Sequence, residues 1–149
     1  MRILYTLLIT IFLVSNVFAQ AKRDILHKAA SNGDIEKVVE LLRSNPHKDI
    51  RDTSGGTVLH AAVKQDNLVV IETIIKAGYD LNAIKPMDGN TPLHDAVIRN
   101  SLPVVKLLIN SGADYKIKNI NRLTAVDIAN RESKHEISDY FKSIGINGD

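Results

Sequence analysis

The sequence has no cysteine and no tryptophan, and aromatic side chains make up only 5% of its 149 residues. Without cysteine the chain forms no disulfide, so side-chain packing alone must stabilise the fold. The shortage of aromatic rings argues against a surface that stacks nucleic acid bases or sugar rings. The formal net charge is +2, which gives no strong attraction to nucleic acid or acidic lipid. We therefore expect no nucleic acid partner.

An apolar run of membrane-spanning length is also missing. The first residues, MRILYTLLITIFLVSNVFAQA, contain one basic residue, Arg2, followed by an apolar run from Ile3 to Val14. This run is 12 residues long. Crossing a bilayer as a helix takes about 20 residues. A basic start, a short apolar run and small residues after it are typical of a secretory signal peptide.

The small residues after this run define two candidate cleavage sites. Val17 and Ala19 suit the −3 and −1 positions of signal peptidase, and so do Ala19 and Ala21. We predict cleavage after Ala19, with Ala21 as the alternative, which divides the chain into a signal peptide (1–19) and a mature domain (20–149). An uncleaved membrane anchor is the weaker alternative, and we expect no stable membrane insertion after cleavage. The chain also lacks the lipid-accepting cysteine of bacterial lipoproteins. We therefore expect the cleaved protein to be located in a bacterial periplasm or to be secreted.

The rest of the sequence repeats itself at a fixed period. TVLHAAV at 57–63 recurs as TPLHDAV at 91–97, and the related segments DILHKAA and TAVDIA begin at residues 24 and 124. Four units therefore follow one another, at about 24–56, 57–90, 91–123 and 124–145. The second halves of the first three units share apolar residues spaced three and four apart, which is the pattern of one helix face. Each unit is expected to form two short antiparallel helices.

Cap and turn residues occupy matching places in these units. A side-chain oxygen at the start of each unit can accept a free backbone N–H of the first helix; the predicted N-caps are Asp24, Thr57, Thr91 and Thr124. The predicted turns inside the pairs contain Gly33, Asp66 and Asn100. Left-handed C-caps are expected after the second helices at Gly78 and Gly112, with Asn45 taking that place in the first unit.

Thr-Pro-Leu-His at 91–94, with its variants at a period of about 33 residues, resembles the ankyrin repeat. The resemblance covers roughly residues 22–145. It implies an all-α fold, an ankyrin-repeat solenoid of stacked helix-turn-helix units joined by β-hairpin-like loops.

Departures from the repeat pattern lie mainly at the ends. In the fourth unit Val126 and Asp127 replace Leu-His, and Arg122 and Leu123 replace the hairpin glycine, for which we expect a less tight turn. The connection between the second and third units is one residue longer than the others, around Lys85–Met87.

The repeated histidine has two interpretations. A zinc site needs ligands about 2 Å from one ion, but neighbouring helices lie about 8–10 Å apart, and no cysteine or carboxylate cluster completes a ligand set. In the ankyrin family this histidine bonds to the neighbouring turn and to its threonine. The resemblance therefore implies a structural role for His27, Thr57, His60, Thr91, His94 and Thr124. We expect no metal and no cofactor.

Catalytic patterns are not recognisable. The glycine-rich TSGG at 53–56 lacks the lysine and spacing of a phosphate-binding loop. No nucleophile, base and orienting residue form a set. We therefore expect that the protein is not an enzyme.

The resemblance implies a partner-binding surface formed by the hairpin tips and the exposed side of the first helices. The first-helix candidates are Lys28, Asn32, Gln65, Asp95 and Arg99. The tip candidates are Arg51, Asp52, Ile84, Lys85, Met87, Ile117, Lys118 and Ile120. Apolar tips can form the centre of an interface, although adjacent hairpins can equally pack them against each other. Because charges of both signs lie at the tips, they predict no particular charge for the partner.

We interpret the sequence as an exported protein that mediates protein–protein interaction in the bacterial envelope, as a periplasmic binder or scaffold. One alternative is an inhibitor or self-protection protein for a co-exported enzyme. Another is a secreted effector that binds a host protein. In each case the expected partner is another protein, and the free chain is expected to be a monomer.

Overall fold

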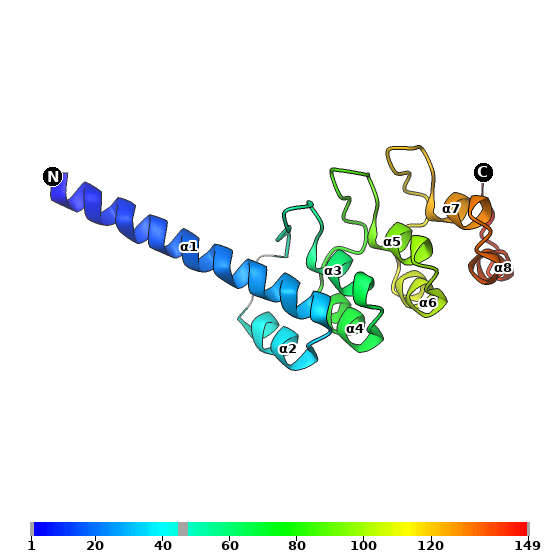
Figure 1. Cartoon of the computed structure of the whole chain (residues 1–149), viewed down its shortest axis with the longest axis horizontal. Helices are drawn as coiled ribbons and strands as arrows, with labels where there is room; N and C mark the ends of the chain where they lie inside the picture. The colour runs from blue at the N-terminus through cyan, green and yellow to red at the C-terminus, as the bar shows by residue number, and fades with distance from the viewer. Residues whose placement is uncertain (1, 45–47, 149) are drawn as a thin grey trace.

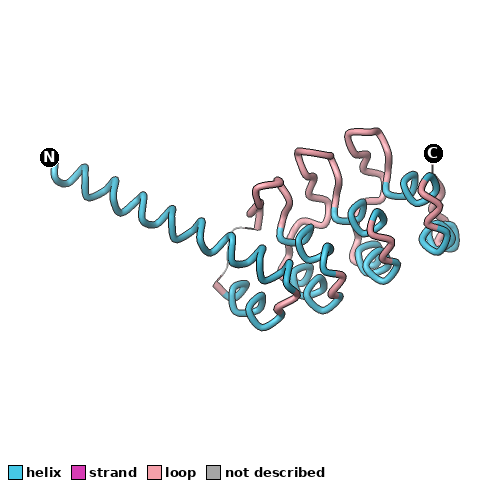
Figure 2. The backbone as a smooth tube through the Cα atoms, viewed as in Figure 1, coloured by secondary structure: helices cyan, strands magenta, loops and turns pink. Residues whose placement is uncertain are grey.

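A computed structural model describes residues 2–44 and 48–148 of the chain, and this part consists of helices arranged as successive pairs along one axis (Figure 1). The helices are α1 (Arg2–Asn32), α2 (Ile35–Arg43), α3 (Val58–Gln65), α4 (Leu68–Lys76), α5 (Pro92–Ile98), α6 (Leu102–Asn110), α7 (Ala125–Arg131) and α8 (His135–Ser143). The loops between pairs project from one edge of the stack (Figure 2). The predicted all-α repeat solenoid is confirmed.

The two helices of each pair are joined by a turn that contains one left-handed residue. Gly33, Asp66, Asn100 and Ser133 take this place, with φ between +53° and +71°. The left-handed conformation costs an ordinary residue roughly 1–2 kcal/mol, but aspartate and asparagine adopt it more readily than most. The three turns predicted from the sequence are therefore confirmed.

Most of the predicted caps are also in place. Thr57, Thr91 and Thr124 are the N-cap residues of α3, α5 and α7. Gly78 and Gly112 follow α4 and α6 with φ of +78° and +94°. The predicted C-cap Asn45 lies outside the described residues.

The predicted N-cap at Asp24 is wrong, because Asp24 lies inside α1. The segment between Ala19 and Asp24 contains neither glycine nor proline, so nothing interrupts the helix that begins at Arg2. The last part of α1 forms the first helix of the first repeat, and the part before it projects away from the stack (Figure 1). Within the described residues, no helix is both long enough and apolar enough to cross a membrane.

The core runs along the whole stack because equivalent positions of the repeats are filled by apolar side chains. Leu26, Leu59, Leu93 and Val126 are buried on the first helices. Leu41, Ile74, Leu108 and Phe141 are buried on the second helices. The first helices pack in the series α1, α3, α5 and α7, and the second helices in the series α2, α4, α6 and α8. Each repeat thus packs chiefly on its neighbours, as in other solenoids.

The hairpin-like loops between repeats close with a similar hydrogen bond each time. The bonds join Asp52 N to Gly56 O (2.9 Å), Lys85 N to Asn90 O (3.0 Å) and Asn119 N to Leu123 O (2.9 Å). The second of these spans one residue more than the others, so the predicted insertion near Lys85–Met87 is confirmed.

The expectation of a less tight turn at Arg122 is wrong. Arg122 adopts φ of +59°, and its N–H donates to Asn119 O at 2.9 Å. Gly55 makes the same bond to Asp52 O, also at 2.9 Å. The Asn119 side chain holds the turn, because its Oδ1 accepts the N–H groups of Asn121 and Leu123. The turn therefore keeps its geometry, with an arginine in a conformation that favours glycine.

Candidate binding surface

The hairpin edge of the molecule is ordered by contacts between successive hairpins. Arg51 Nη1 donates to Ile84 O (2.7 Å), which joins the first hairpin to the second. Ile120 N donates to Asp88 O (3.2 Å), which joins the second to the third. Gly89 lies against this last contact, since a Cβ there would be 2.6 Å from Ile120 N. A surface held in this way loses little freedom when a partner binds.

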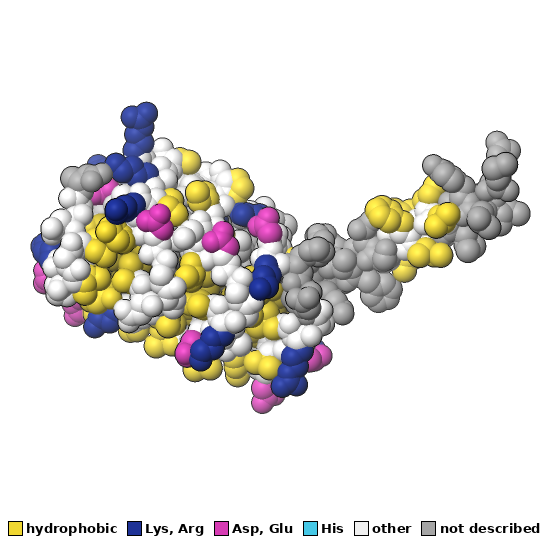
Figure 3. Space-filling model, turned by 180° about the vertical axis from the view of Figure 1, so that it is seen from behind, with side chains coloured by type: hydrophobic (Ala, Val, Ile, Leu, Met, Phe, Trp, Pro, Cys, Tyr) yellow, Lys and Arg dark blue, Asp and Glu magenta, His cyan; other side chains and the backbone are white. Residues whose placement is uncertain are grey.

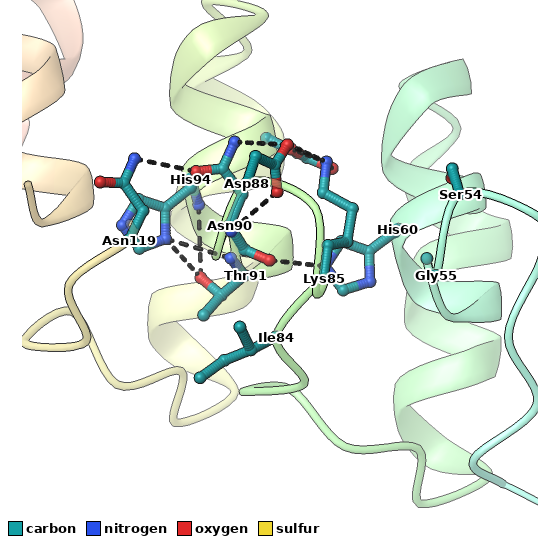
Figure 4. A network of polar contacts seen from close by, with 12 residues as sticks. Ser54, Gly55, His60, Ile84, Lys85, Asp88, Asn90, Thr91, His94 and Asn119 are labelled. Carbon is teal, nitrogen blue, oxygen red and sulfur yellow. Dashed lines mark hydrogen bonds and ion pairs between the residues drawn. The ribbon is translucent and has the colours of Figure 1, made fainter. Parts of the chain in front are cut away.

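The repeated histidines tie each first helix to the next hairpin. Their Nε2 atoms lie near backbone carbonyl oxygens of that hairpin: His27 near Gly56 (3.1 Å), His60 near Asn90 (3.1 Å) and His94 near Leu123 (3.0 Å). The contacts around His94 and His60 are drawn in Figure 4. The same contact between a histidine and a backbone carbonyl therefore connects each of three consecutive repeats to the hairpin that follows it.

The hydrogen bonds also assign the tautomer of two of these rings. The backbone N–H groups of Thr57 and Thr91 donate to Nδ1 of His60 and His94, both at 3.2 Å. Nδ1 is therefore the acceptor, so Nε2 carries the proton and donates to the carbonyl. Burial lowers the pKa of both rings and outweighs their bonds to the hairpin carbonyls, which favours this neutral form.

Two predicted contact residues, Lys85 and Asp95, are not surface residues. Lys85 Nζ lies 2.8 and 3.0 Å from the carboxylate oxygens of Asp95 on α5, and 3.1 Å from Asp88 (Figure 4). The two residues are only 9% and 7% exposed. Burial alone would lower the pKa of Lys85, but the two carboxylates outweigh it and raise the pKa. The pair stabilises the hairpin against α5 and offers no free charge to a partner.

Two other tip candidates are engaged in the first hairpin. Asp52 Oδ1 accepts hydrogen bonds from the N–H groups of Ser54 and Gly56, each at 2.9 Å, and from Ser54 Oγ at 2.6 Å. Burial alone would raise the pKa of Asp52 because it disfavours the charged form, but these hydrogen bonds outweigh burial and lower the pKa. Arg51 Nη1 also donates to Gly55 O at 3.0 Å. Both side chains are half-buried and contribute first to the shape of the hairpin.

The remaining candidates are accessible. Met87 is 73% exposed and Ile120 is 63% exposed, so the hairpins do not pack these two side chains against each other. Ile117 is half-buried. The other accessible candidates are Lys28, Asn32, Gln65, Ile84, Arg99 and Lys118. The surface is therefore a row of tips beside a row of helix ends, and a role for these residues in binding stays a prediction.

Sequence reasoning missed a row of exposed side chains at the ends of the first helices. Lys64, Ile98 and Arg131 occupy the same repeat position on α3, α5 and α7, and all are exposed. The signal was present in the period, because these residues lie 33 or 34 positions apart. Among the residues that the structure describes, no cluster of three metal-ligating side chains occurs.

A family model for ankyrin repeats, in three copies, matches residues 14–119. The chain belongs to the ankyrin repeat family. A comparison with curated proteins finds no match. Ankyrin repeats typically act as non-enzymatic modules for binding other proteins, so this chain carries a protein–protein interaction module.

The ankyrin stack continues beyond the matched residues. Helices α7 and α8 pack on α5 and α6 as the earlier pairs pack on one another. At the histidine position this last pair has Asp127, whose carboxylate accepts from Thr124 N (2.8 Å) and Thr124 Oγ1 (2.7 Å). Near it lies Gly148, where a Cβ would be 3.0 Å from Asp127 Oδ1. The fourth ankyrin unit therefore caps its first helix with a carboxylate at the position where the preceding repeats have histidine.

Proposed function

We propose that the chain is exported by its N-terminal segment, cleaved near Ala19, and binds another exported protein in the bacterial envelope as a periplasmic binder or scaffold. The observation that carries the export step is the exposed apolar surface of the projecting part of α1. Leu8, Ile11, Phe12 and Leu13 are all exposed there, and Phe12 is 68% exposed. Figure 3 shows apolar side chains on this projecting part. A contiguous apolar patch of this kind is unusual on a soluble monomer unless something else covers or removes it. Recognition and removal by an export machinery account for it.

Cell fractionation with mass measurement tests the export step. Expressed in a Gram-negative host, the wild-type chain should appear in the periplasm with the mass of residues 20–149 or 22–149. The Leu8→Arg/Leu13→Arg variant breaks the apolar run and should stay in the cytoplasm at full length. Recovery of the uncleaved wild-type chain from the cytoplasm would overturn export.

The proposed contact surface includes Met87 and Ile120 at the hairpin tips. Both are large apolar side chains exposed on an ordered edge, where an interface can bury them at little cost in conformational freedom. Their neighbouring hairpins are linked by the bond from Ile120 N to Asp88 O. A partner that covers both tips would therefore contact two repeats at once.

A pull-down from envelope extract, with the mature chain as bait, identifies the partner. Met87→Glu and Ile120→Glu should each weaken its capture roughly tenfold or more, because a charge is placed in a desolvated contact. The melting temperature should not change, because both side chains point to solvent. Val69→Glu on α4 is the matched control, since Val69 is 60% exposed on a second helix. Equal capture by wild type and both tip variants would remove the tips from the interface.

A further inference from the structure

The second helices carry a balanced set of charges. Together α2, α4, α6 and α8 contain five basic and five acidic side chains. Several of these pair within one helix, such as Lys37 with Glu40 and Lys76 with Glu72, each at 2.8 Å. This layer therefore presents little uncompensated charge to a partner.

The ends of the first helices carry basic side chains without such compensation. Lys64 and Arg131 share one repeat position, and Arg99 directly follows the equivalent Ile98 as the C-cap of α5. All three are exposed near the C-terminal ends of α3, α5 and α7, and we call them the cationic row. Within the described part of the chain no ion pair joins them to an acidic side chain; Glu132, next to Arg131, lies 3.7 Å from Lys134. The helix dipole favours cations at such ends, but only by about 0.3–1 kcal/mol each.

A hollow lies at one end of this row. It has a volume of about 350 Å³ and lies between the third hairpin and α7, with Arg122, Leu123, Asn130 and Arg131 in its wall, beside Lys118 and Asp127. The Asp127 carboxylate in this wall already accepts two hydrogen bonds from Thr124. The hollow therefore offers two guanidinium groups, and arginine is well suited to bidentate recognition of carboxylates.

We propose that the cationic row and this hollow bind an extended acidic segment of the partner protein. The inference rests on the proposed function, since it specifies the chemistry of the protein that the surface binds. Neighbouring first helices lie about 8–10 Å apart, and an extended chain in the polyproline II conformation rises about 3.1 Å per residue and places every third side chain on the same side. An acidic residue at every third position therefore matches the row. Nucleic acid fits less well, because the chain has few aromatic side chains on which bases could stack.

Fluorescence anisotropy with a labelled 12-residue peptide tests the proposal, on protein recovered after expression of the whole chain. The peptide carries glutamate at every third position between alanine and serine, and its control carries glutamine instead. The glutamate peptide should bind more tightly, and the difference should shrink as salt rises from about 50 to about 300 mM, because exposed ion pairs are screened.

Matched charge variants assign the site. The triple variant Lys64→Gln/Arg99→Gln/Arg131→Gln should weaken the glutamate peptide roughly tenfold, because exposed ion pairs are individually small and add along a row. The control triple Arg43→Gln/Lys76→Gln/Lys142→Gln removes the same charge from the last turns of α2, α4 and α8, and should leave affinity unchanged. Equal losses in the two triples would overturn the proposal. Tighter binding of single-stranded DNA of equal charge would overturn it as well.

The experiments distinguish an error in this proposal from an error in the proposed function. Export is measured by fractionation, in which the cationic row takes no part. If the envelope partner is captured equally by wild type and by the Lys64/Arg99/Arg131 triple variant, protein binding stands and the acidic segment is wrong.

Discussion

The third repeat and the fourth repeat fill the same position with different polar side chains, His94 and Asp127. In the third, His94 reaches forward from α5 to the carbonyl of Leu123 in the next hairpin, at 3.0 Å. In the fourth, Asp127 turns back to Thr124 on its own helix, at 2.7 and 2.8 Å. Both side chains thus bond to the threonine that begins their own helix, and His94 also bonds to the hairpin that follows.

The same two repeats differ in how they fill the position that follows. Asp95 of the third repeat forms a buried ion pair with Lys85, whereas Ile128 of the fourth is a buried apolar side chain. The second repeat has Ala61 there, which is also buried. This repeat position can therefore hold either a buried apolar side chain or a buried carboxylate that is paired with a lysine.

Removing one member of the buried ion pair should have the largest effect. Asp95→Ala leaves the Lys85 ammonium buried with only Asp88 nearby, and should cost about 3–5 kcal/mol of unfolding free energy. The double variant Asp95→Ala/Lys85→Met, which makes the third repeat apolar like the fourth, should recover most of that loss. Urea unfolding followed by circular dichroism measures both. An Asp95→Ala protein as stable as wild type would show that the pair is not buried in solution.

The linking histidine should matter more than the capping aspartate. His94→Ala leaves Leu123 O and Thr91 N without their partner, and should cost about 2–3 kcal/mol. Asp127→Ala removes a cap that is partly open to solvent, and should cost about 1 kcal/mol. The comparison of their urea midpoints is the measurement. A larger loss for Asp127→Ala would show that this side chain stabilises the fold by more than its bonds to Thr124.

Acidification should weaken the interior repeats. Burial lowers the pKa of His60 and His94 in the folded protein, so the unfolded chain takes up protons first as the pH falls. Their contribution is complete above the unfolded pKa of about 6.5. It declines as the pH falls from there toward the lower folded values. Melting temperatures between about pH 7 and about pH 5 should therefore fall, and should fall less in His60→Gln/His94→Gln. Parallel slopes would rule out these histidines as the cause.

The smallest expected effect concerns the hairpin turn at Arg122, and Gly89 in the preceding hairpin provides a contrasting variant. Arg122→Gly should stabilise the protein by about 0.5–1 kcal/mol, because it relieves a left-handed arginine at some cost in unfolded-state entropy. Gly89→Ala should destabilise it, since Gly89 has φ of +72° and a Cβ would be 2.6 Å from Ile120 N. Thermal melting of the two variants checks the opposite signs. A lower melting temperature for Arg122→Gly would mean that the arginine side chain contributes more than its backbone costs.

Much of the fold could be predicted because its determinants are local and repeated. The cap at Thr91, the turn at Asn100 and the stop at Gly112 each depend on neighbours a few residues away. The N-cap prediction for Asp24 was wrong because Asp24 can begin a helix only if the preceding helix has already ended, and α1 continues through it. The candidate surface was predicted less well, because whether Lys85 is exposed depends on Asp95, ten residues further along.

The sequence by itself determined the period, the helix pairs and the family, since these follow from side-chain spacing and backbone preferences within one unit. Only the tertiary structure decided which charges remain available at the surface. Stacking places Lys85 against the carboxylates of Asp88 and Asp95, and leaves Arg99 and Arg131 exposed. The physical reason is that an ion pair forms through space between elements that the repeat geometry brings together, and a one-dimensional pattern does not record that distance.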